Sequence, residues 1–156
     1  MIISFTGHRP DKLGGYKLPN PTYNYVCKEI EKTLLSLKPE KVISGMALGI
    51  DQWAAFICVK NKIPFTAAIP FEGQESAWPF KSQETYRILL SKATDKVIVS
   101  PGGYSAQKMQ IRNEWMVNNS DILIAVYNGD KAGGTANCVK YAEGLNKKII
   151  YINPCP

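Results

Sequence analysis

The stretch Lys41-Val42-Ile43-Ser44-Gly45-Met46-Ala47-Leu48-Gly49-Ile50-Asp51 decides the fold of this 156-residue chain. It begins as a short apolar run, passes through a turn with two glycines, and ends at an acidic residue. A run of this kind with Val and Ile predicts a strand, and residues 51–61 have the apolar spacing of a helix. The stretch is therefore one strand–loop–helix unit, and Asp51 is expected to be the N-cap of its helix.

The same alternation continues in both directions along the chain. The apolar patterns predict strands over 2–6, 41–44, 65–70, 96–100, 121–127 and 148–152, and helices over 23–37, 51–61, 79–92, 106–118 and 134–145. Such alternation is typical of an α/β fold, in which helices cover both faces of a parallel sheet. The continuous runs Val97-Ile98-Val99 and 122–126 are expected in strands buried on both faces. We therefore expect one domain over residues 1–156, with a mostly parallel sheet of about six strands.

Composition and charge narrow the class of partner. The chain is 45% apolar and 21% charged, which is typical of a globular protein, and its net charge of +6 raises the question of a nucleic-acid partner. Eight lysines, against three carboxylates, lie where the predicted helices end and the strands begin, so that end of the sheet carries +5 of the net charge. Lysines there complement the helix dipoles, so nucleic acid is not the favoured partner.

The sequence also bears on compartment and on metals. No run of eighteen apolar residues exists and the N-terminus does not resemble a signal peptide, so we expect a cytoplasmic protein with no membrane segment. The four cysteines have no C-x-x-C spacing, which fits a reducing compartment. With His8 as the only histidine, neither a metal site nor a His-based catalytic triad is expected.

Glycines and polar residues collect after the predicted strands. In open α/β sheets, ligands bind beyond the carboxyl ends of the strands, so these segments predict a site at that end. The opposite loops are short, charged and nearly free of glycine, which strengthens the prediction. The segments are Thr6-Gly7-His8-Arg9-Pro10, Ser44 to Asp51, Phe71-Glu72-Gly73-Gln74, Ser100 to Ser105, and Asn128 to Thr135.

Two of these segments join a strand to a helix through glycines, at residues 44–49 and 133–135. Backbone N–H groups at such helix N-termini can hold a phosphate or carboxylate, although tight turns without a ligand have the same composition. Neither segment matches G-x-G-x-x-G or the Walker A pattern, so a standard dinucleotide fold or P-loop ATPase is disfavoured. Arg9 and Arg112 are two of only three arginines and can pair with phosphate; a surface ion pair is the other interpretation of Arg112.

Aromatic residues and carboxylates supply further candidates. Trp78, Tyr86, Tyr104 and Tyr127 can stack on a base, whereas Trp53 and Trp115 are assigned to packing or to a contact between subunits. Asp51, Glu72 and Glu75 lie near the predicted site. Glu72 directly follows a strand and is the candidate general acid or base. Exposed tryptophans on a small α/β domain would favour a homo-oligomer, a dimer or higher.

Five motifs together resemble the YpsA-like branch of the SLOG superfamily, which also holds the DprA proteins and the LOG enzymes. The resemblance covers nearly the whole chain. It implies a Rossmann-like fold that binds a nucleotide or nucleotide-derived ligand, with the glycine loops at its phosphate or ribose. The motifs are Thr6-Gly7-His8-Arg9-Pro10, Ser44 to Asp51, Pro70-Phe71-Glu72-Gly73-Gln74, Arg112-Asn113-Glu114-Trp115-Met116-Val117, and Gly133-Gly134-Thr135.

The resemblance leaves three functions open. The favoured one is binding of a nucleotide-derived small molecule (ADP-ribose-like, cyclic nucleotide or nucleoside phosphate) by a sensor or a sequestering protein. The second is N-glycosidic cleavage, as in LOG enzymes. Their signature P-G-G-x-G-T-x-x-E is incomplete here, because Gly103 precedes Tyr104-Ser105 and Cys138 stands where the glutamate would follow Thr135. The third is single-stranded nucleic-acid binding, as in DprA proteins.

The predicted site therefore combines the loops after five strands, and whether the chain is an enzyme stays open. No cofactor is predicted with certainty beyond a nucleotide-type ligand. Glu72 is the predicted catalytic residue. The predicted ligand-binding residues are Thr6, Gly7, His8, Arg9, Ser44, Gly45, Met46, Ala47, Gly49, Asp51, Phe71, Glu72, Gln74, Trp78, Ser100, Tyr104, Arg112, Asn113, Tyr127, Asn128, Gly133, Gly134 and Thr135.

Overall fold

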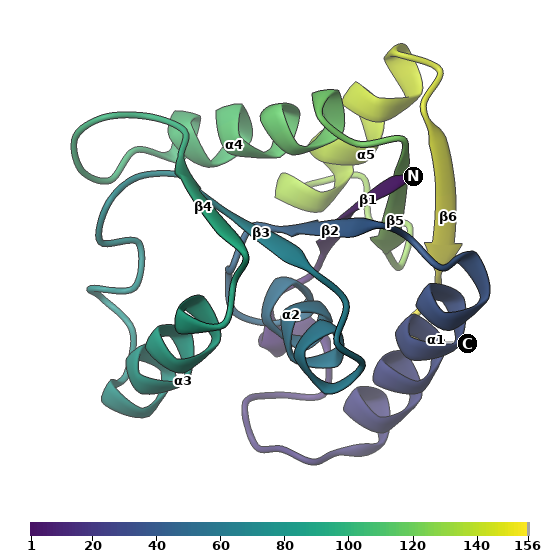
Figure 1. Ribbon diagram of the computed structural model, residues 1–156, viewed down its shortest axis with the longest axis horizontal. Helices are drawn as coiled ribbons and strands as arrows, with labels where there is room; N and C mark the ends of the chain where they lie inside the picture. The colour runs from purple at the N-terminus through teal and green to yellow at the C-terminus, as the bar shows by residue number, and fades with distance from the viewer. Residues whose placement is uncertain (156) are drawn as a thin grey trace.

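A six-stranded sheet forms the middle layer of the computed structural model, which describes residues 1–155 (Figure 1). The strands lie in the order β4-β3-β2-β1-β5-β6, and every neighbouring pair is parallel. This confirms the predicted Rossmann-like α/β fold. The strands are β1 (Ile2–Gly7), β2 (Lys41–Ser44), β3 (Phe65–Ile69), β4 (Asp95–Ile98), β5 (Ile122–Val126) and β6 (Lys148–Ile152).

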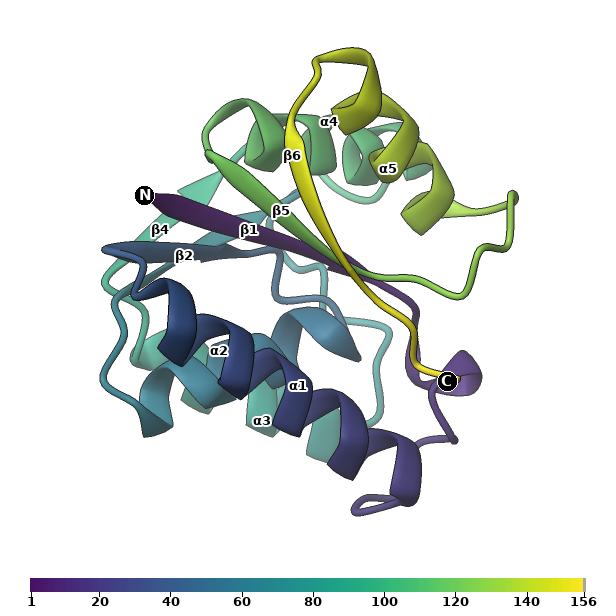
Figure 2. The ribbon, with the colours of Figure 1, turned by 90° about the vertical axis from the view of Figure 1, so that its right-hand side faces the viewer.

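Helices cover both faces of the sheet. One face carries α1 (Pro21–Leu37), α2 (Ile50–Lys60) and α3 (Phe80–Ser91), and the other carries α4 (Ala106–Asn118) and α5 (Gly134–Gly144), as the turned view in Figure 2 shows. A 3-10 turn at Pro10–Lys12, which the sequence patterns did not predict, follows β1. Within residues 1–155, no helix has both the length and the apolar character needed to span a membrane.

Local sequence chemistry sets where the helices begin. Asn20 caps α1 by accepting the N–H of Tyr23 at 2.9 Å, and Pro21 occupies the first helical position, so α1 starts two residues before its apolar spacing predicted. The prediction that Asp51 caps α2 is wrong. The N-cap is Gly49, with φ of 94°, and Asp51 lies inside the first turn.

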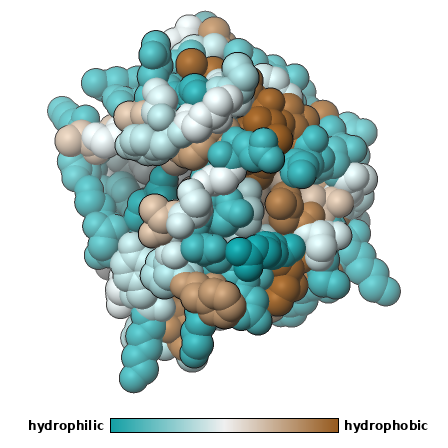
Figure 3. Space-filling model, turned by 90° about the vertical axis from the view of Figure 1, so that its left-hand side faces the viewer, coloured by the Kyte–Doolittle hydropathy of each residue, from teal (hydrophilic) through white to brown (hydrophobic). Residues whose placement is uncertain are grey.

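Burial differs between the interior and the edges of the sheet. Every residue of β3 and β5 is buried, as expected for parallel strands covered on both faces. The same expectation was wrong for the run Val97-Ile98-Val99. It begins in the edge strand β4, where Ile98 is 43% exposed, because a strand at the edge has fewer elements packed against it. Figure 3, seen from this side, shows apolar patches among hydrophilic surface.

The point that matters for function is the switch in strand order. The chain leaves β4 at one edge of the sheet and re-enters it at β5, beside β1. Gly7 lies opposite Val126 in the register of β1 and β5, so the segments beginning at His8 and Tyr127 leave the sheet side by side. Ligands of open α/β sheets bind at such switch points, beyond the carboxyl ends of the strands.

Candidate functional site

A cavity of about 550 Å³ lies at the carboxyl ends of the strands. It is bounded by the segments after β1 and β2, the N-terminal half of α4 and the N-terminus of α5. Its lining comprises Phe5, Thr6, Gly7, His8, Arg9, Asp11, Lys12, Ala47, Leu48, Asp51, Tyr104, Ala106, Met109, Gln110, Arg112, Asn113, Ala132, Gly133, Gly134, Thr135 and Asn137.

About half of the predicted ligand-binding residues meet in this cavity. They come from four separate parts of the sequence, which the parallel sheet and its switch point bring together. The predicted residues in the lining are Thr6, Gly7, His8, Arg9, Ala47, Asp51, Tyr104, Arg112, Asn113, Gly133, Gly134 and Thr135.

The remaining predicted residues lie outside the lining. They are Ser44, Gly45, Met46, Gly49, Phe71, Glu72, Gln74, Trp78, Ser100, Tyr127 and Asn128. Several of them support residues that do line the cavity. Phe71 is buried and packs edge-on against Tyr104, which lines the cavity, at a ring-centroid distance of 5.7 Å. Trp78 packs edge-on against Tyr86 at 5.4 Å, and neither of these two rings belongs to the lining.

Sequence reasoning missed part of the wall formed by α4. Ala106, Met109, Gln110 and Asn113 line the cavity at spacings of three and four residues, which places them on one face of the helix. Only Asn113 was predicted. Stepping back along the helix from it would have found the other three. The remaining missed residues, which had no such signal, are Phe5, Asp11, Lys12, Leu48, Ala132 and Asn137.

Internal hydrogen bonds hold the loop after β2. The Ser44 hydroxyl donates to the Asp51 carbonyl at 2.7 Å and accepts the N–H of Met46 at 3.2 Å. The Asp51 carboxylate accepts the N–H of Ala47 at 3.4 Å. Ser44, which was predicted to offer its hydroxyl to a ligand, therefore shapes the loop, and only Ala47 and Leu48 of residues 44–49 line the cavity.

A buried arginine braces the same loop from α4. Arg112 is 2% exposed, and its Nη1 donates to the carbonyls of Gly45 at 2.6 Å and Ala68 at 3.2 Å. Gln74 donates a second hydrogen bond to Gly45 at 3.1 Å. The interpretation of Arg112 as part of a surface ion pair is therefore wrong. The position of Arg112 in the helical pattern did not predict that its side chain is buried.

The electrostatics of the cavity follow from this arrangement. Burial lowers the pKa of Arg112, while the nearby Asp51 opposes the shift; an arginine nevertheless keeps its charge in proteins. Burial raises the pKa of Asp51, and the positive charges of Arg112 and Arg9 oppose that shift. Arg9 is exposed at the cavity, so it is the cation best placed to meet an incoming anion.

The segments after β1 and β5 are joined beside the cavity by a hydrogen bond between His8 and Asn128. His8 is buried, and its Nε2 accepts the N–H of Asn128 at 3.1 Å, so the neutral ring carries its proton on Nδ1. Burial is the main cause that lowers the pKa of His8. Farther out, Lys12 and Asp130 form an exposed ion pair at 3.0 Å. Asn128 and Tyr127 therefore contact His8, which lines the cavity, but do not line it themselves: Asn128 donates to His8, and the ring centroid of Tyr127 lies 5.9 Å from that of His8.

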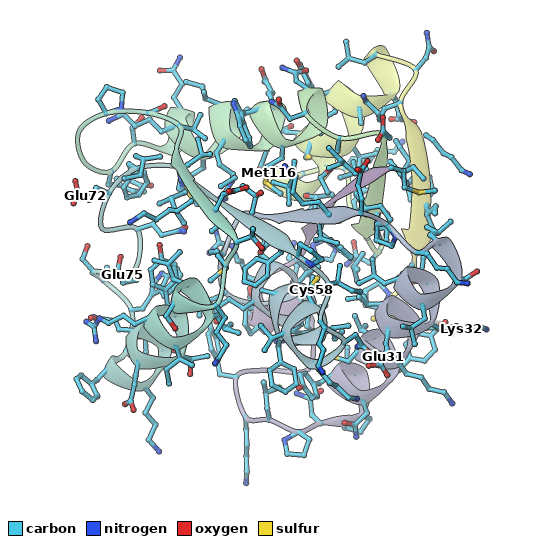
Figure 4. All side chains as sticks on the ribbon, in the orientation of Figure 1. Glu31, Lys32, Cys58, Glu72, Glu75 and Met116 are labelled. Atoms are coloured by element: carbon cyan, nitrogen blue, oxygen red, sulfur yellow. The ribbon has the colours of Figure 1, made fainter. Side chains whose placement is uncertain are left out.

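Glu72 stands apart from the cavity. It is exposed and does not belong to the lining, and Figure 4 shows it on the outer side of the loop after β3, at the margin of the molecule. The carboxylates that do line the cavity are Asp11 and Asp51. Within residues 1–155, no group of three His, Cys, Asp or Glu side chains is arranged to hold a metal ion.

The tryptophan side chains are less exposed than the prediction of a homo-oligomer assumed. Trp53 is 7% exposed and packs edge-on against Tyr23, and Trp78 and Trp115 are half-buried. The interpretation of Trp53 and Trp115 as packing residues therefore agrees with their burial. The expectation of exposed tryptophans is wrong.

Comparisons with known proteins agree with the fold. A model of the YpsA family, described as the YspA SLOG family, matches residues 3–154. The chain is similar to the uncharacterized SPbeta prophage-derived protein YoqJ of Bacillus subtilis, with 38% identity over 73% of this chain and 75% of the relative. It is also similar to a UPF0398 protein of Halalkalibacterium halodurans, with 31% identity over 96% of this chain and 84% of the relative.

Solved structures show the same fold at low identity. DprA of Helicobacter pylori, described with its single-stranded DNA binding mode, superposes with a TM-score of 0.70 at 15% identity over 98% of this chain and 65% of that one. DprA of Streptococcus pneumoniae superposes with a TM-score of 0.68 at 17% identity, and the match covers 97% of this chain and 50% of that one. A molybdenum cofactor binding protein of Rippkaea orientalis superposes with a TM-score of 0.61 at 17% identity, and the match covers 96% of this chain and 74% of that one. The chain thus spans half to two thirds of the DprA chains.

Proposed function

We propose that this chain, which belongs to the YpsA SLOG family, binds a nucleotide-derived small molecule in the cavity at the carboxyl end of its sheet. The ligand class is a phosphate-bearing nucleoside: ADP-ribose-like, a cyclic nucleotide or a nucleoside phosphate. The cavity of about 550 Å³ falls within the range of about 300–1,000 Å³ that is usual for small-molecule sites.

One observation carries the proposal: two helix N-termini and an exposed arginine meet in a single cavity. The loop before α2 contributes Ala47 and Leu48, and the start of α5 contributes Gly133, Gly134 and Thr135. The first N–H groups of a helix have no acceptor within it, and the helix dipole favours negative charge there. Arg9 adds a planar donor suited to phosphate. Together they favour an anionic ligand.

The remaining lining suits the other parts of a nucleotide. Tyr104 is 77% exposed and lines the cavity, so its ring is available to stack on a base. Asp51 and Asn113 can accept hydrogen bonds from ribose hydroxyls. These roles extend the anion site into a nucleotide site.

Calorimetry with AMP, ADP-ribose, NAD and cyclic nucleotides tests this function. We expect at least one of them to bind, and Arg9→Ala to weaken that binding about tenfold or more, because hydrogen bonds between charged groups are lost. Thr135→Ala should weaken it less. The matched control is Arg87→Ala: Arg87 is the third arginine, exposed on α3 and outside the lining. Absence of binding across the panel would contradict the proposal.

The DprA neighbours support a second candidate, single-stranded nucleic-acid binding. The test is binding to oligonucleotides, with an affinity that falls steeply as salt rises because bound cations are released from the strand. Lys38→Glu, at the end of the sheet opposite the cavity, should leave that binding unchanged if the strand enters the cavity.

The N-glycosidase alternative loses its candidate residue. Glu72 is exposed and lies outside the cavity lining, which argues against a role for it in cleaving a ligand held there. We therefore expect Glu72→Gln to leave nucleotide binding unchanged and expect no free base to be released by the unmodified protein.

The wider setting of the function stays a prediction. We place the protein in the cytoplasm as a sensor or a sequestering protein, supported by four cysteines that are all free in residues 1–155. The predicted homo-oligomer is supported by large apolar side chains that are exposed on α3 and β4, namely Phe80, Ile88 and Ile98. Light scattering of the purified protein tests it.

A further inference from the structure

A second cavity, of about 200 Å³, lies beside the main one. It is enclosed by the segment after β1, the first turn of α2 and the first half of α3. Leu48 is the one residue that lines both cavities, and Arg9 and Asp11 face the main cavity while Pro10 faces the smaller one. The backbone after β1 and β2 is thus a wall between two separate spaces.

Apolar side chains form much of the wall of this smaller cavity. Tyr16 and Leu18 line it and are 62% and 45% exposed, although both are large and apolar. Trp53 lines it from α2 but is otherwise buried. A flat apolar ring in the cavity would cover side chains that water now contacts, which is favourable.

One buried polar side chain faces this space. Gln52 is 7% exposed and lines the cavity, and its Nε2 donates to the Met46 carbonyl at 3.3 Å. That bond fixes the orientation of the amide, because the reverse orientation would set Oε1 against the Met46 carbonyl oxygen. Within residues 1–155, Oε1 of Gln52 accepts no hydrogen bond from the protein and is not among the fully buried unpartnered atoms, so it is accessible from the cavity and can accept a hydrogen bond from a ligand.

The size and the charges restrict what can bind. A space of about 200 Å³ is smaller than the pockets of about 300–1,000 Å³ that hold whole drug-sized ligands, so it suits one ring system rather than a nucleotide. Lys81 lines the cavity from α3, and within the lining no carboxylate balances it. A cationic ring is therefore disfavoured.

We propose that the smaller cavity is a second binding site, for a planar heterocycle that carries an N–H group and no positive charge. The N–H donates to Oε1 of Gln52, and the ring packs against Tyr16 and Leu18. This site goes beyond the proposed function and does not depend on it, because the linings of the two cavities have only Leu48 in common.

Saturation-transfer NMR with indole as the probe tests the site. We expect indole to receive saturation from the protein, and 1-methylindole, which lacks the donor, to bind about fivefold more weakly. Thr85→Trp places a bulky ring at an exposed helix position in the lining and should abolish the indole signal. Glu84→Trp, next to it on α3, exposed and outside the lining, is the matched control and should keep the signal.

Three results would overturn the site. Equal binding of indole and 1-methylindole would exclude the hydrogen bond to Gln52. An indole signal that survives in Thr85→Trp would exclude this location. Loss of the signal in Arg9→Ala would place the ring in the main cavity instead. Failure of every nucleotide to bind, by contrast, would overturn the proposed function and leave this site standing.

Discussion

The loops after β2 and after β5 both lead into helix N-termini at the main cavity, but the protein holds them in different ways. The loop after β2 is buried, and side chains from three other segments reach it: Arg112 and Gln74 both donate to the Gly45 carbonyl, and Asp51 accepts from Ala47. The loop after β5 is exposed from Asn128 to Gly134. Apart from the hydrogen bond that the buried His8 accepts from Asn128, its hydrogen bonds and its ion pair are local or lie at the surface.

The ties of the β5 loop are weaker in kind. The Tyr127 hydroxyl donates to the Asp130 carbonyl at 2.6 Å, and the Asp130 carboxylate accepts the N–H of Ala132. Lys12 pairs with Asp130 at the surface, where both side chains are partly exposed to water. Exposed pairs of this type contribute little to stability because water competes for both partners. The comparison teaches that one half of the proposed anion site is held by buried side chains before any ligand arrives, whereas the other half can adjust around a ligand.

The largest effect is expected from removing the Arg112 side chain, which holds the loop after β2. Arg112→Ala leaves Gln74 as the remaining side-chain donor to the Gly45 carbonyl, removes the Arg112 donor from the Ala68 carbonyl, and leaves Asp51 without its buried counter-charge. We expect a loss of about 3 kcal/mol in the free energy of unfolding, measured by urea denaturation. Arg87→Ala, on an exposed helix face, is the control and should change little. A small effect of Arg112→Ala would mean that the hydrogen bonds of Ser44 and Asp51 are sufficient to hold the loop after β2.

A pair of glycine substitutions compares the two loops directly. A Cβ at Gly45 would lie 2.7 Å from Arg112 Nη1 and 2.7 Å from Asp51 Oδ2, so Gly45→Ala must displace a buried side chain. A Cβ at Gly134 would meet nothing within 4 Å. We expect Gly45→Ala to lower the free energy of unfolding by about 2 kcal/mol, and Gly134→Ala to change it by no more than about 0.5 kcal/mol.

Equal effects of the two substitutions would contradict the division into a fixed and an adjustable loop. Urea denaturation of both variants under the same conditions supplies the measurement, and the unchanged slope of each transition with urea would exclude an altered unfolded state.

These same loops explain how far the sequence could predict the fold. The alternation of apolar runs was sufficient for the parallel sheet, because each strand buried on both faces must read as a continuous apolar stretch. It could not identify β4 as an edge strand. Val97-Ile98-Val99 is as apolar as residues 122–126, and the strand order depends on packing between segments far apart in the sequence.

The site was predictable in its place and less so in its residues. Glycines and polar residues after each strand indicated the end of the sheet at which the main cavity lies. Whether a side chain there faces the cavity or the loop behind it depends on directions that composition does not encode. Ser44 and Gln74 turned inward to hold the loop, Glu72 turned outward, and Met109 and Gln110 entered the wall only through the register of α4.

A pH series probes the join between the segments after β1 and β5. His8 accepts the N–H of Asn128 only as the neutral ring, and its pKa in the folded protein is lowered from the ordinary 6.5, chiefly by burial. The unfolded chain therefore binds a proton more readily, so stability present above pH 6.5 is lost as the pH falls through and below that value. Thermal unfolding between pH 7.5 and about pH 5 measures the loss.

His8→Gln is the matched variant for that series, because its amide oxygen can still accept the N–H of Asn128 and does not titrate. We expect its melting temperature to fall less than that of the unmodified protein over the same pH range. Parallel curves for the two proteins would show that other groups cause the acid dependence.

The smallest effect is expected where the adjustable loop is tied at the surface. Asp130→Asn removes the charge that pairs with Lys12 and weakens the acceptor for Ala132. Because both partners are in contact with water, the urea midpoint should not move measurably. Amide hydrogen exchange at residues 128–133 should nevertheless become faster, since local opening of a loop requires only that its own ties be lost. Exchange at residues 44–49 should stay slow in the same variant, because Arg112 and Gln74 still hold that loop. If amide exchange became faster in both loops, residues 44–49 and 128–133 would open as one unit. The loop after β2 would then not be held independently of the loop after β5.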